Sequence, residues 1–219
     1  MKTATNNYSN TKNTNLYKLV LTGIFAAVVA VCSWISIPLP FTQVPINLAI
    51  LGVLLAGGCL GWKHGGLSLI IYVLLGAVGL PVFAGFGAGL GTLVGPTGGY
   101  IAGYILCAAI AGLGASSSSA SKFSKHPALR LAFFMAVGVI ACYTFGTIWY
   151  VLLMKTSLWV GLISCVFPFI PFDAFKIAIA VLLVTRLRKA HMPTVHSPRT
   201  FGRRAEPHTI IIARGERVR

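Results

Sequence analysis

The chain has 219 residues, of which 56% are apolar and only 10% are charged. Soluble domains carry about 25% charged residues, so this composition excludes an ordinary soluble enzyme. Lys and Arg number 18 against three acids, which gives a net charge of +15. Because the chain is so apolar and its bases are scattered in small clusters, the charge indicates a membrane protein and no nucleic-acid partner.

Residues 1–15 are polar and rich in Asn and Thr, which predicts a disordered N-terminus. Apolar runs then recur, and a helix needs ~20 mostly apolar residues to span a bilayer. We therefore predict an all-α integral membrane protein with six transmembrane helices, in one membrane domain over residues 16–190. The expected spans are about 16–36, 45–62, 66–82, 97–115, 128–153 and 158–185.

Basic residues mark alternate connections between these spans. They lie before the first span, between the second and third, between the fourth and fifth, and after the sixth. The other loops, 37–44, 83–96 and 154–157, contain a single basic residue, Lys155. Cytoplasmic loops carry the excess of Lys and Arg, so we expect both the N- and the C-terminus in the cytoplasm.

The first span and the loop after it each allow two interpretations. Ala26 and Ala30 form a small-xxx-small face, which lets a helix approach closely. That face can bind a partner subunit or a neighbouring helix of the same chain. The loop Pro38–Asn47 is stiffened by prolines and carries Asn47, so it is either a lid on the outer side or a plain connector.

The stretch Leu80–Tyr100 is rich in glycine but contains no phosphate-binding motif, because no Gly-Lys-Ser/Thr occurs in the chain. Glycine permits unusual backbone angles, so the stretch can fold over a pocket. Pro96-Thr97 would start the next helix, and free N–H groups there can bind an anion or a carbonyl. Tight packing of small residues is the alternative explanation.

Asp173 is the only acidic side chain in residues 1–190, and Lys176 follows three residues later. This spacing places both on one face of a helix, and ionisable groups inside a membrane indicate a functional site. Asp173 lies ~20 Å from Arg186 at about 1.5 Å per residue, hence in the outer half of the membrane. Pro168 and Pro171 predict a helix start or break just upstream. A structural ion pair is the alternative, although such pairs add little stability.

Two further features predict no special chemistry. The five cysteines lie far apart in apolar runs without metal-ligand spacing, so we expect no metal and no cofactor. Residues 191–219 are basic and contain prolines, which predicts a disordered tail or a non-native extension. Contact of this tail with lipid headgroups or RNA is the alternative.

Four motifs in order resemble one known family. They are Val44-Pro-Ile with Gly52-Val-Leu-Leu-Ala-Gly57, then Gly79-Leu-Pro-Val-Phe-Ala84, then Gly95-Pro-Thr-Gly-Gly-Tyr100, and last Pro168-Phe-Ile-Pro-Phe-Asp173-Ala-Phe-Lys176. Over about residues 16–190 the pattern resembles the BioY family, the biotin-specific substrate-binding (S) components of energy-coupling-factor (ECF) transporters. The resemblance implies six helices and a biotin pocket near the outer face.

The resemblance also implies a role. The chain would be the biotin-binding subunit of an ECF-type ABC transporter in the cell membrane, without enzymatic activity. Its partners would be a transmembrane coupling protein, docked on the Ala26 and Ala30 face, and two ATP-binding subunits.

Asp173 and Lys176 match the family's ligand-binding Asp and Lys. A carboxylate can accept the ureido N–H groups of biotin, and a lysine can hold its carboxylate. Asn47, Thr97 and Tyr100 are further candidates for substrate binding.

Two alternatives stay open. One is an S component for another small vitamin. The other is a membrane enzyme with Asp173 as general base and His64 or His126 assisting, although both histidines map to cytoplasmic loops.

Overall fold

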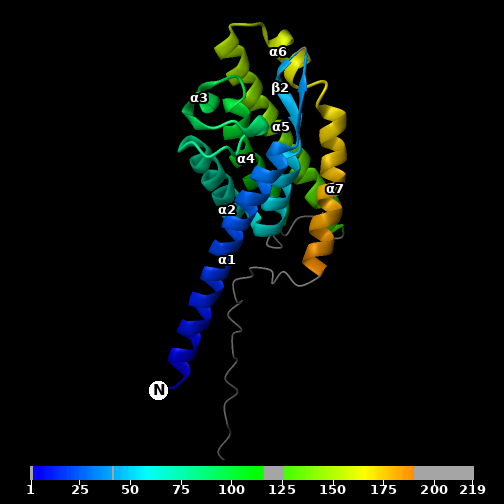
Figure 1. Cartoon of the computed structure of the whole chain (residues 1–219). Helices are drawn as coiled ribbons and strands as arrows, with labels where there is room; N and C mark the ends of the chain where they lie inside the picture. Colours follow the sequence, from blue (N-terminus) through cyan, green and yellow to red (C-terminus); the bar gives the residue numbers. More distant parts are fainter. Residues whose placement is uncertain (1, 41, 116–125, 190–219) are drawn as a thin grey trace, which may run out of the picture.

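The computed structural model describes residues 2–40, 42–115 and 126–189, so the predictions made for 191–219 lie outside the described residues. The described chain is a bundle of helices with one two-stranded antiparallel hairpin at its upper end (Figure 1). In chain order the elements are α1 (Lys2–Trp34), β1 (Ser36–Leu39), β2 (Thr42–Asn47), α2 (Ala49–Ala77), the 3-10 turn η1 (Ala84–Phe86), α3 (Gly89–Val94), α4 (Gly98–Ala115), α5 (Pro127–Met154), α6 (Leu158–Cys165) and α7 (Ile170–Lys189).

Three of the expected spans coincide with single helices. The apolar part of α1 is Leu16–Trp34, and α4 and α5 end within one residue of the ranges 97–115 and 128–153. α1, however, begins at Lys2, so residues 2–15 are helical where the sequence predicted disorder. Neither proline nor glycine occurs before Gly23, so nothing interrupts the helix that continues backwards from the apolar run.

The expected spans 45–62 and 66–82 lie largely within α2, which is broken at Gly61. Gly61 has φ 79° and ψ 179°, which a residue with a side chain rarely adopts. After this break the chain doubles back, because a Cβ atom on Gly65 would lie only 2.8 Å from the Cα atom of Gly57. α2 is therefore two helical segments packed against each other.

The expected span 158–185 is also broken. α6 ends at Cys165 and α7 begins at Ile170, with a bend of 52° between them. The break contains Pro168, so the predicted interruption before Asp173 is confirmed. Within the described residues, four helices are long and apolar enough to cross a membrane, and five if α6 and α7 together form one span.

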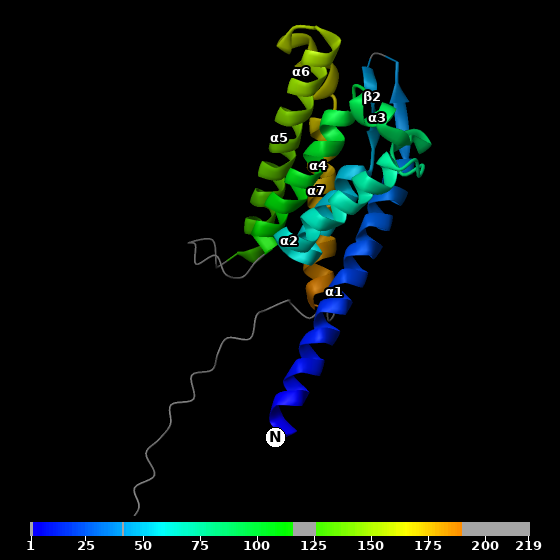
Figure 2. The ribbon, with the colours of Figure 1, turned by 90° about the vertical axis from the view of Figure 1, so that its left-hand side faces the viewer.

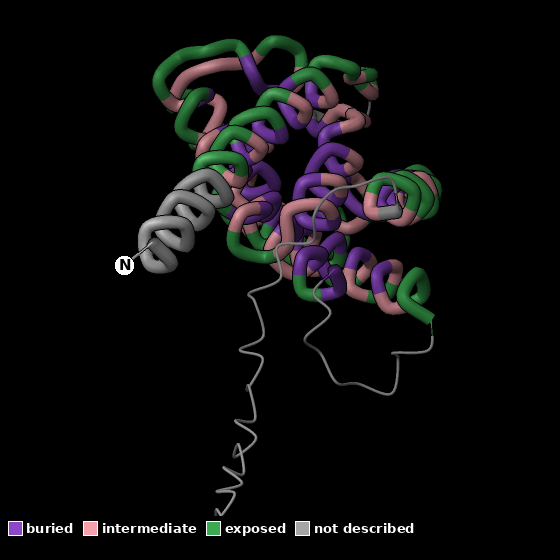
Figure 3. The backbone as a smooth tube through the Cα atoms, turned by 90° about the horizontal axis from the view of Figure 1, so that it is seen from below, coloured by how far each residue is buried: buried purple, intermediate pink, exposed green. Residues whose placement is uncertain are grey.

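The core is built around α4. Buried residues gather on the inward sides of the helices, and exposed residues surround the outside (Figure 3). Gly57 of α2 has no room for a side chain, because a Cβ atom there would lie 2.3 Å from the carbonyl oxygen of Ala108 in α4. A Cβ atom on Gly103 of α4 would lie 3.2 Å from the Cα atom of Cys142 in α5. Small residues thus let α2 and α5 approach α4 at backbone distance.

The two ends of the bundle differ in character. The start of α1 and the end of α7 lie at one end, whereas the hairpin, α3 and α6 lie at the other (Figures 1 and 2). At the first end Arg130 donates from Nε to the Gly114 carbonyl at 3.0 Å. Arg188 donates from Nη1 to the Ala115 carbonyl at 2.6 Å. Both arginines thus satisfy the last carbonyls of α4.

Ala26 and Ala30 do not form an exposed docking face. They are only 1% and 7% exposed, because this side of α1 packs against α2. Gly52 of α2 allows the approach, since a Cβ atom there would lie 3.0 Å from the Cα atom of Val29. Packing within the chain, one of the two interpretations, is observed, and a partner contact at these two alanines stays a prediction.

Candidate functional site

Asp173 and Lys176 form a buried ion pair at the beginning of α7. Their side chains are 2% and 6% exposed, and Lys176 Nζ lies 2.7 Å from Asp173 Oδ1. Asp173 stands in the first turn of the helix, where the backbone dipole favours a negative charge. The predicted pairing through i, i+3 spacing is confirmed.

Tyr143 of α5 completes the environment of the carboxylate. Its hydroxyl donates to Asp173 Oδ2 at 2.5 Å, so each carboxylate oxygen accepts one hydrogen bond from a side chain. The sequence argument missed this residue. A buried tyrosine hydroxyl needs a hydrogen-bond partner. A tyrosine inside an apolar span could therefore have been predicted to pair with a polar group of another helix.

The hairpin brings Asn47 to the same place. Lys176 Nζ donates to the backbone carbonyl of Asn47 at 2.7 Å. The side-chain oxygen of Asn47 accepts from the Ala49 N–H at 3.0 Å and so supports the start of α2. The loop expected at Pro38–Asn47 is thus an ordered hairpin, in which Ser36 pairs with Asn47.

A small chamber lies beside the ion pair, and a larger one adjoins it. The small one, of about 30 Å³, is lined by Asp173, Lys176 and Tyr143. The larger one, of about 220 Å³, is lined by Ser33, Tyr72, Phe83, Thr92 and Thr97, among others. Both share one set of lining residues, which are Val44, Pro45, Asn47, Tyr100 and Tyr104.

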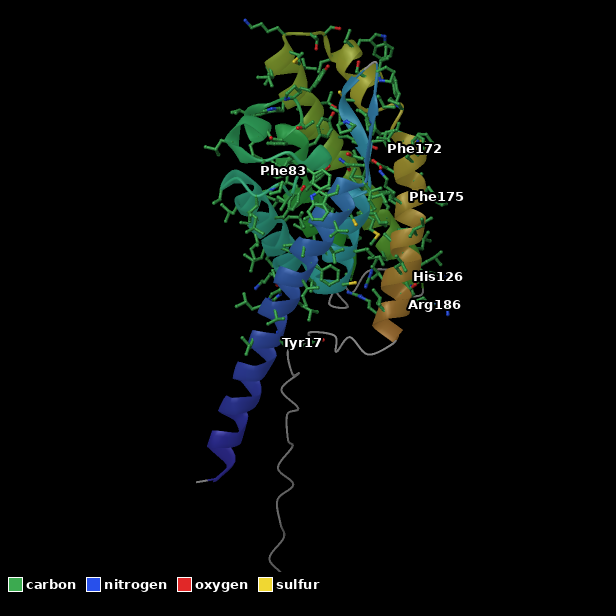
Figure 4. The ribbon with its side chains drawn as sticks, in the orientation of Figure 1. Tyr17, Phe83, His126, Phe172, Phe175 and Arg186 are labelled. Carbon is green, nitrogen blue, oxygen red and sulfur yellow. The ribbon has the colours of Figure 1, made fainter. Side chains whose placement is uncertain are left out.

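The glycine-rich stretch closes the larger chamber. Gly85 and Gly89 have φ values of 63° and 80°, so the predicted unusual backbone is confirmed there. This backbone lets Phe83 turn inward, where its ring meets Tyr72 edge-on at 5.5 Å within the body of the bundle (Figure 4). Trp34 at the end of α1 holds the loop in place, because its Nε1–H donates to the Pro81 carbonyl at 2.7 Å.

The structure brings most of the predicted site residues together. Asp173, Lys176, Asn47 and Tyr100 line the small chamber, and Thr97 lines the larger one. The histidines of the enzyme alternative line neither chamber. His126 lies with Arg186 near the opposite end (Figure 4). Among residues 2–40, 42–115 and 126–189, no group of three or more His, Cys, Asp or Glu side chains is placed to hold a metal ion.

Fold and site together define a helical membrane protein with two adjoining chambers, the smaller of which is lined by a buried ion pair. The aromatic walls suit an apolar body, and the pair offers an acceptor and a donor side by side. Such an arrangement binds and orients a small molecule with a polar end.

Comparison with known proteins defines the family. The BioY family matches residues 4–192, and the chain belongs to this family. It is 42% identical over 173 residues to the biotin transporter BioY of Thermotoga maritima, covering 78% of this chain and 96% of that protein. It is 37% identical over 168 residues to the probable biotin transporter BioY of Pyrococcus horikoshii, covering 77% and 94%.

A solved structure is similar as well. The crystal structure of the S-component for biotin from an ECF-type ABC transporter superposes with a TM-score of 0.70 at 31% identity. The match covers 81% of this chain and 93% of that one. The resemblance to the family that the four motifs indicated is therefore confirmed.

The ion pair generates a stability prediction. Lys176→Met leaves the Asp173 carboxylate buried with Tyr143 as its only side-chain partner. We expect this variant to lose about 3–5 kcal/mol of unfolding free energy, because an unpaired buried charge is costly. The double variant Asp173→Asn/Lys176→Met should recover more than half of that loss. Unfolding in mixed micelles measures both, and a Lys176→Met variant as stable as the parent would contradict the buried pair.

Proposed function

We propose that this chain is the biotin-binding S component of an ECF-type ABC transporter and has no enzymatic activity of its own. The observation that carries the proposal is the buried Asp173–Lys176 pair, which lines the smaller of two adjoining chambers. It occurs in a chain whose relatives are biotin transporters and whose fold matches an S-component for biotin. The same geometry supports capture of the ligand beneath the hairpin and the glycine-rich loop.

The contact between the two charges favours one orientation of biotin. Asp173 Oδ1 and Lys176 Nζ are 2.7 Å apart, so both groups meet the same end of an extended ligand. In the ureido ring an N–H donor stands next to a carbonyl acceptor. Asp173 accepts from the N–H, and the remaining N–H of Lys176 donates to the carbonyl. This assigns Lys176 to the ureido group, in place of the carboxylate that the sequence argument gave it.

The valerate arm then extends into the larger chamber, past Tyr100 and Tyr104. Phe83 and Tyr72 supply apolar surface for its methylene groups. Its carboxylate lies toward Thr97, directly before the N-terminus of α4 at Gly98. A helix N-terminus favours an anion, so this end of the chamber suits the carboxylate.

The binding assignment predicts losses of affinity at two residues. Asp173→Asn and Lys176→Ala should each weaken biotin binding roughly 10- to 100-fold, because each removes a hydrogen bond to a charged group. Lys63→Ala is the matched control, since it removes a lysine that lines neither chamber. Calorimetry on the purified protein measures all four affinities. Absence of micromolar binding by the parent protein, or equal affinity in the site variants, would refute the biotin assignment.

The orientation is tested with biotin carboxamide, in which the carboxylate is neutral. With the ureido group on Lys176, the amide should bind more weakly than biotin by the same factor in the parent protein and in Lys176→Ala. If biotin and its carboxamide bound Lys176→Ala with equal affinity, the carboxylate of biotin would have to contact the lysine. That result would overturn the orientation.

We also infer six membrane spans, with both termini cytoplasmic, in the cell membrane. The doubling back of α2 after Gly61 supports counting it as two spans, and α6 with α7 supplies the sixth. The bend of α2 packs against Gly112, near the end of α4 where Arg130 and Arg188 bind. Lys155 stands at the far end of α5. This distribution supports a basic cytoplasmic side.

Topology can be tested by cysteine labelling in a background without the five native cysteines. A membrane-impermeant maleimide added to intact cells should label Lys155→Cys but not Lys63→Cys. In permeabilised cells both variants should be labelled, which shows that both cysteines can react with the maleimide. Labelling of Lys63→Cys in intact cells would contradict the orientation.

Energy for transport is proposed to come from a membrane coupling protein and two ATP-binding subunits. The chain contains no Gly-x-x-x-x-Gly-Lys-Ser/Thr motif, and its structural relative belongs to an ECF-type ABC transporter. Cells that express this chain should accumulate labelled biotin only when the ATP-binding subunits are present. Equal accumulation in cells that lack those subunits would contradict the dependence.

A further inference from the structure

A glycine of α2 lies behind one wall of the larger chamber. Gly76 is buried near the end of the helix, and a Cβ atom there would lie 2.5 Å from Cε1 of Phe83 and closer still to its Cζ and Cε2 atoms. Gly76 has no positive φ, so its backbone would accept an alanine. The glycine therefore provides a notch in the surface of α2, and the rim of the Phe83 ring occupies it.

Tyr72 confines the Phe83 ring along the same face of α2. It stands one helical turn before Gly76, and its ring meets that of Phe83 edge-on at 5.5 Å. The Ser33 hydroxyl donates to the Val29 carbonyl at 2.9 Å, so in its 2.8 Å contact with Tyr72 the tyrosine is the donor. This bond fixes Tyr72 to α1. A ring displaced from the notch therefore has no space on the Tyr72 side.

The backbone that carries Phe83 is held in place as well. Its N–H donates to the Gly87 carbonyl at 3.0 Å. Trp34 stacks on Phe86 with ring centroids 5.3 Å apart and donates to the Pro81 carbonyl. The open direction for the ring is the larger chamber of about 220 Å³, which Phe83 lines. A methyl group in the notch would therefore push the ring into the space for a ligand.

We infer that Gly76 is a specificity-determining residue, because it sets the width of the larger chamber. The notch takes up the rim of the Phe83 ring, so the wall stands back and leaves room for the arm of a ligand. The inference rests on the proposed binding of biotin with its valerate arm in this chamber. It assigns the role to a residue that lines neither chamber and that acts only through Phe83.

Replacement of the glycine by alanine tests this role. Gly76→Ala should bind biotin roughly tenfold more weakly than the parent protein, because overpacking moves the Phe83 ring into the chamber. The matched control is Gly66→Ala, at another buried position of α2, where a Cβ atom would lie 3.9 Å from the Cβ atom of Ala109. Both replacements raise the helix propensity of α2, but only the first fills the notch. The control should bind biotin as the parent protein does.

A double variant separates a shifted wall from a damaged fold. Leucine lacks the Cε and Cζ atoms that the new methyl group would meet. In the Phe83→Leu background, Gly76→Ala should therefore change the affinity for biotin by less than about threefold. Titration calorimetry measures the affinities and the stoichiometry together. A shifted wall lowers the affinity at unchanged stoichiometry, whereas misfolded protein lowers the stoichiometry.

The outcomes distinguish this inference from the proposed function. A parent protein that does not bind biotin would refute the proposed function and this inference with it. If the parent binds biotin, the inference alone is overturned by any of three results. These are an unchanged affinity in Gly76→Ala, an equal loss in Gly66→Ala, or a loss that persists in the Phe83→Leu background.

Discussion

A carboxylate and an ammonium group inside a membrane domain have to satisfy each other, because an isolated charge there is strongly destabilising. Asp173 does so with Lys176 and Tyr143, and Lys176 adds the backbone carbonyl of Asn47. These contacts join α7, α5 and the end of β2, which are distant in the sequence. The position of α7 and that of the hairpin are therefore both set by the same pair of charges, and the small chamber lies where these elements meet.

How far the fold follows from the sequence depends on how each helix ends. Spans 97–115 and 128–153 are predictable because a long apolar run stops abruptly at each side. The α6–α7 break was predictable from Pro168, but the bend angle was not, since packing decides it. The N-terminal helix was missed because a polar composition does not exclude a helix that extends an apolar one. Lys63 and His64 between the two expected spans indicated a loop just after Gly61. The tightness of this turn follows only from the backbone angles of Gly61.

The site was predictable to the extent that charge is rare in the chain. Asp173 stood out as the sole acid of the membrane domain, and its spacing from Lys176 identified the pair. Tyr143 did not stand out, because it is one of seven tyrosines in the chain and only the packing of α5 against α7 brings its hydroxyl to Asp173. The small-residue face at Ala26 left two interpretations open for a related reason. Spacing shows that a helix can approach closely, but it does not say whether the neighbour belongs to the same chain.

Lys176 is anchored to the main chain of β2 and not to a side chain. A carbonyl oxygen is present whichever residue occupies position 47, so this contact survives an exchange of that residue. Exchange of Asn47, which lines both chambers, does not by itself release the lysine. The backbone at position 47 thus holds the charged group, while the side chain at the same position belongs to the chamber wall. A replacement at position 47 therefore leaves Lys176 in place but removes the hydrogen bond that supports the start of α2, so a change there exchanges helix stability for a new chamber wall.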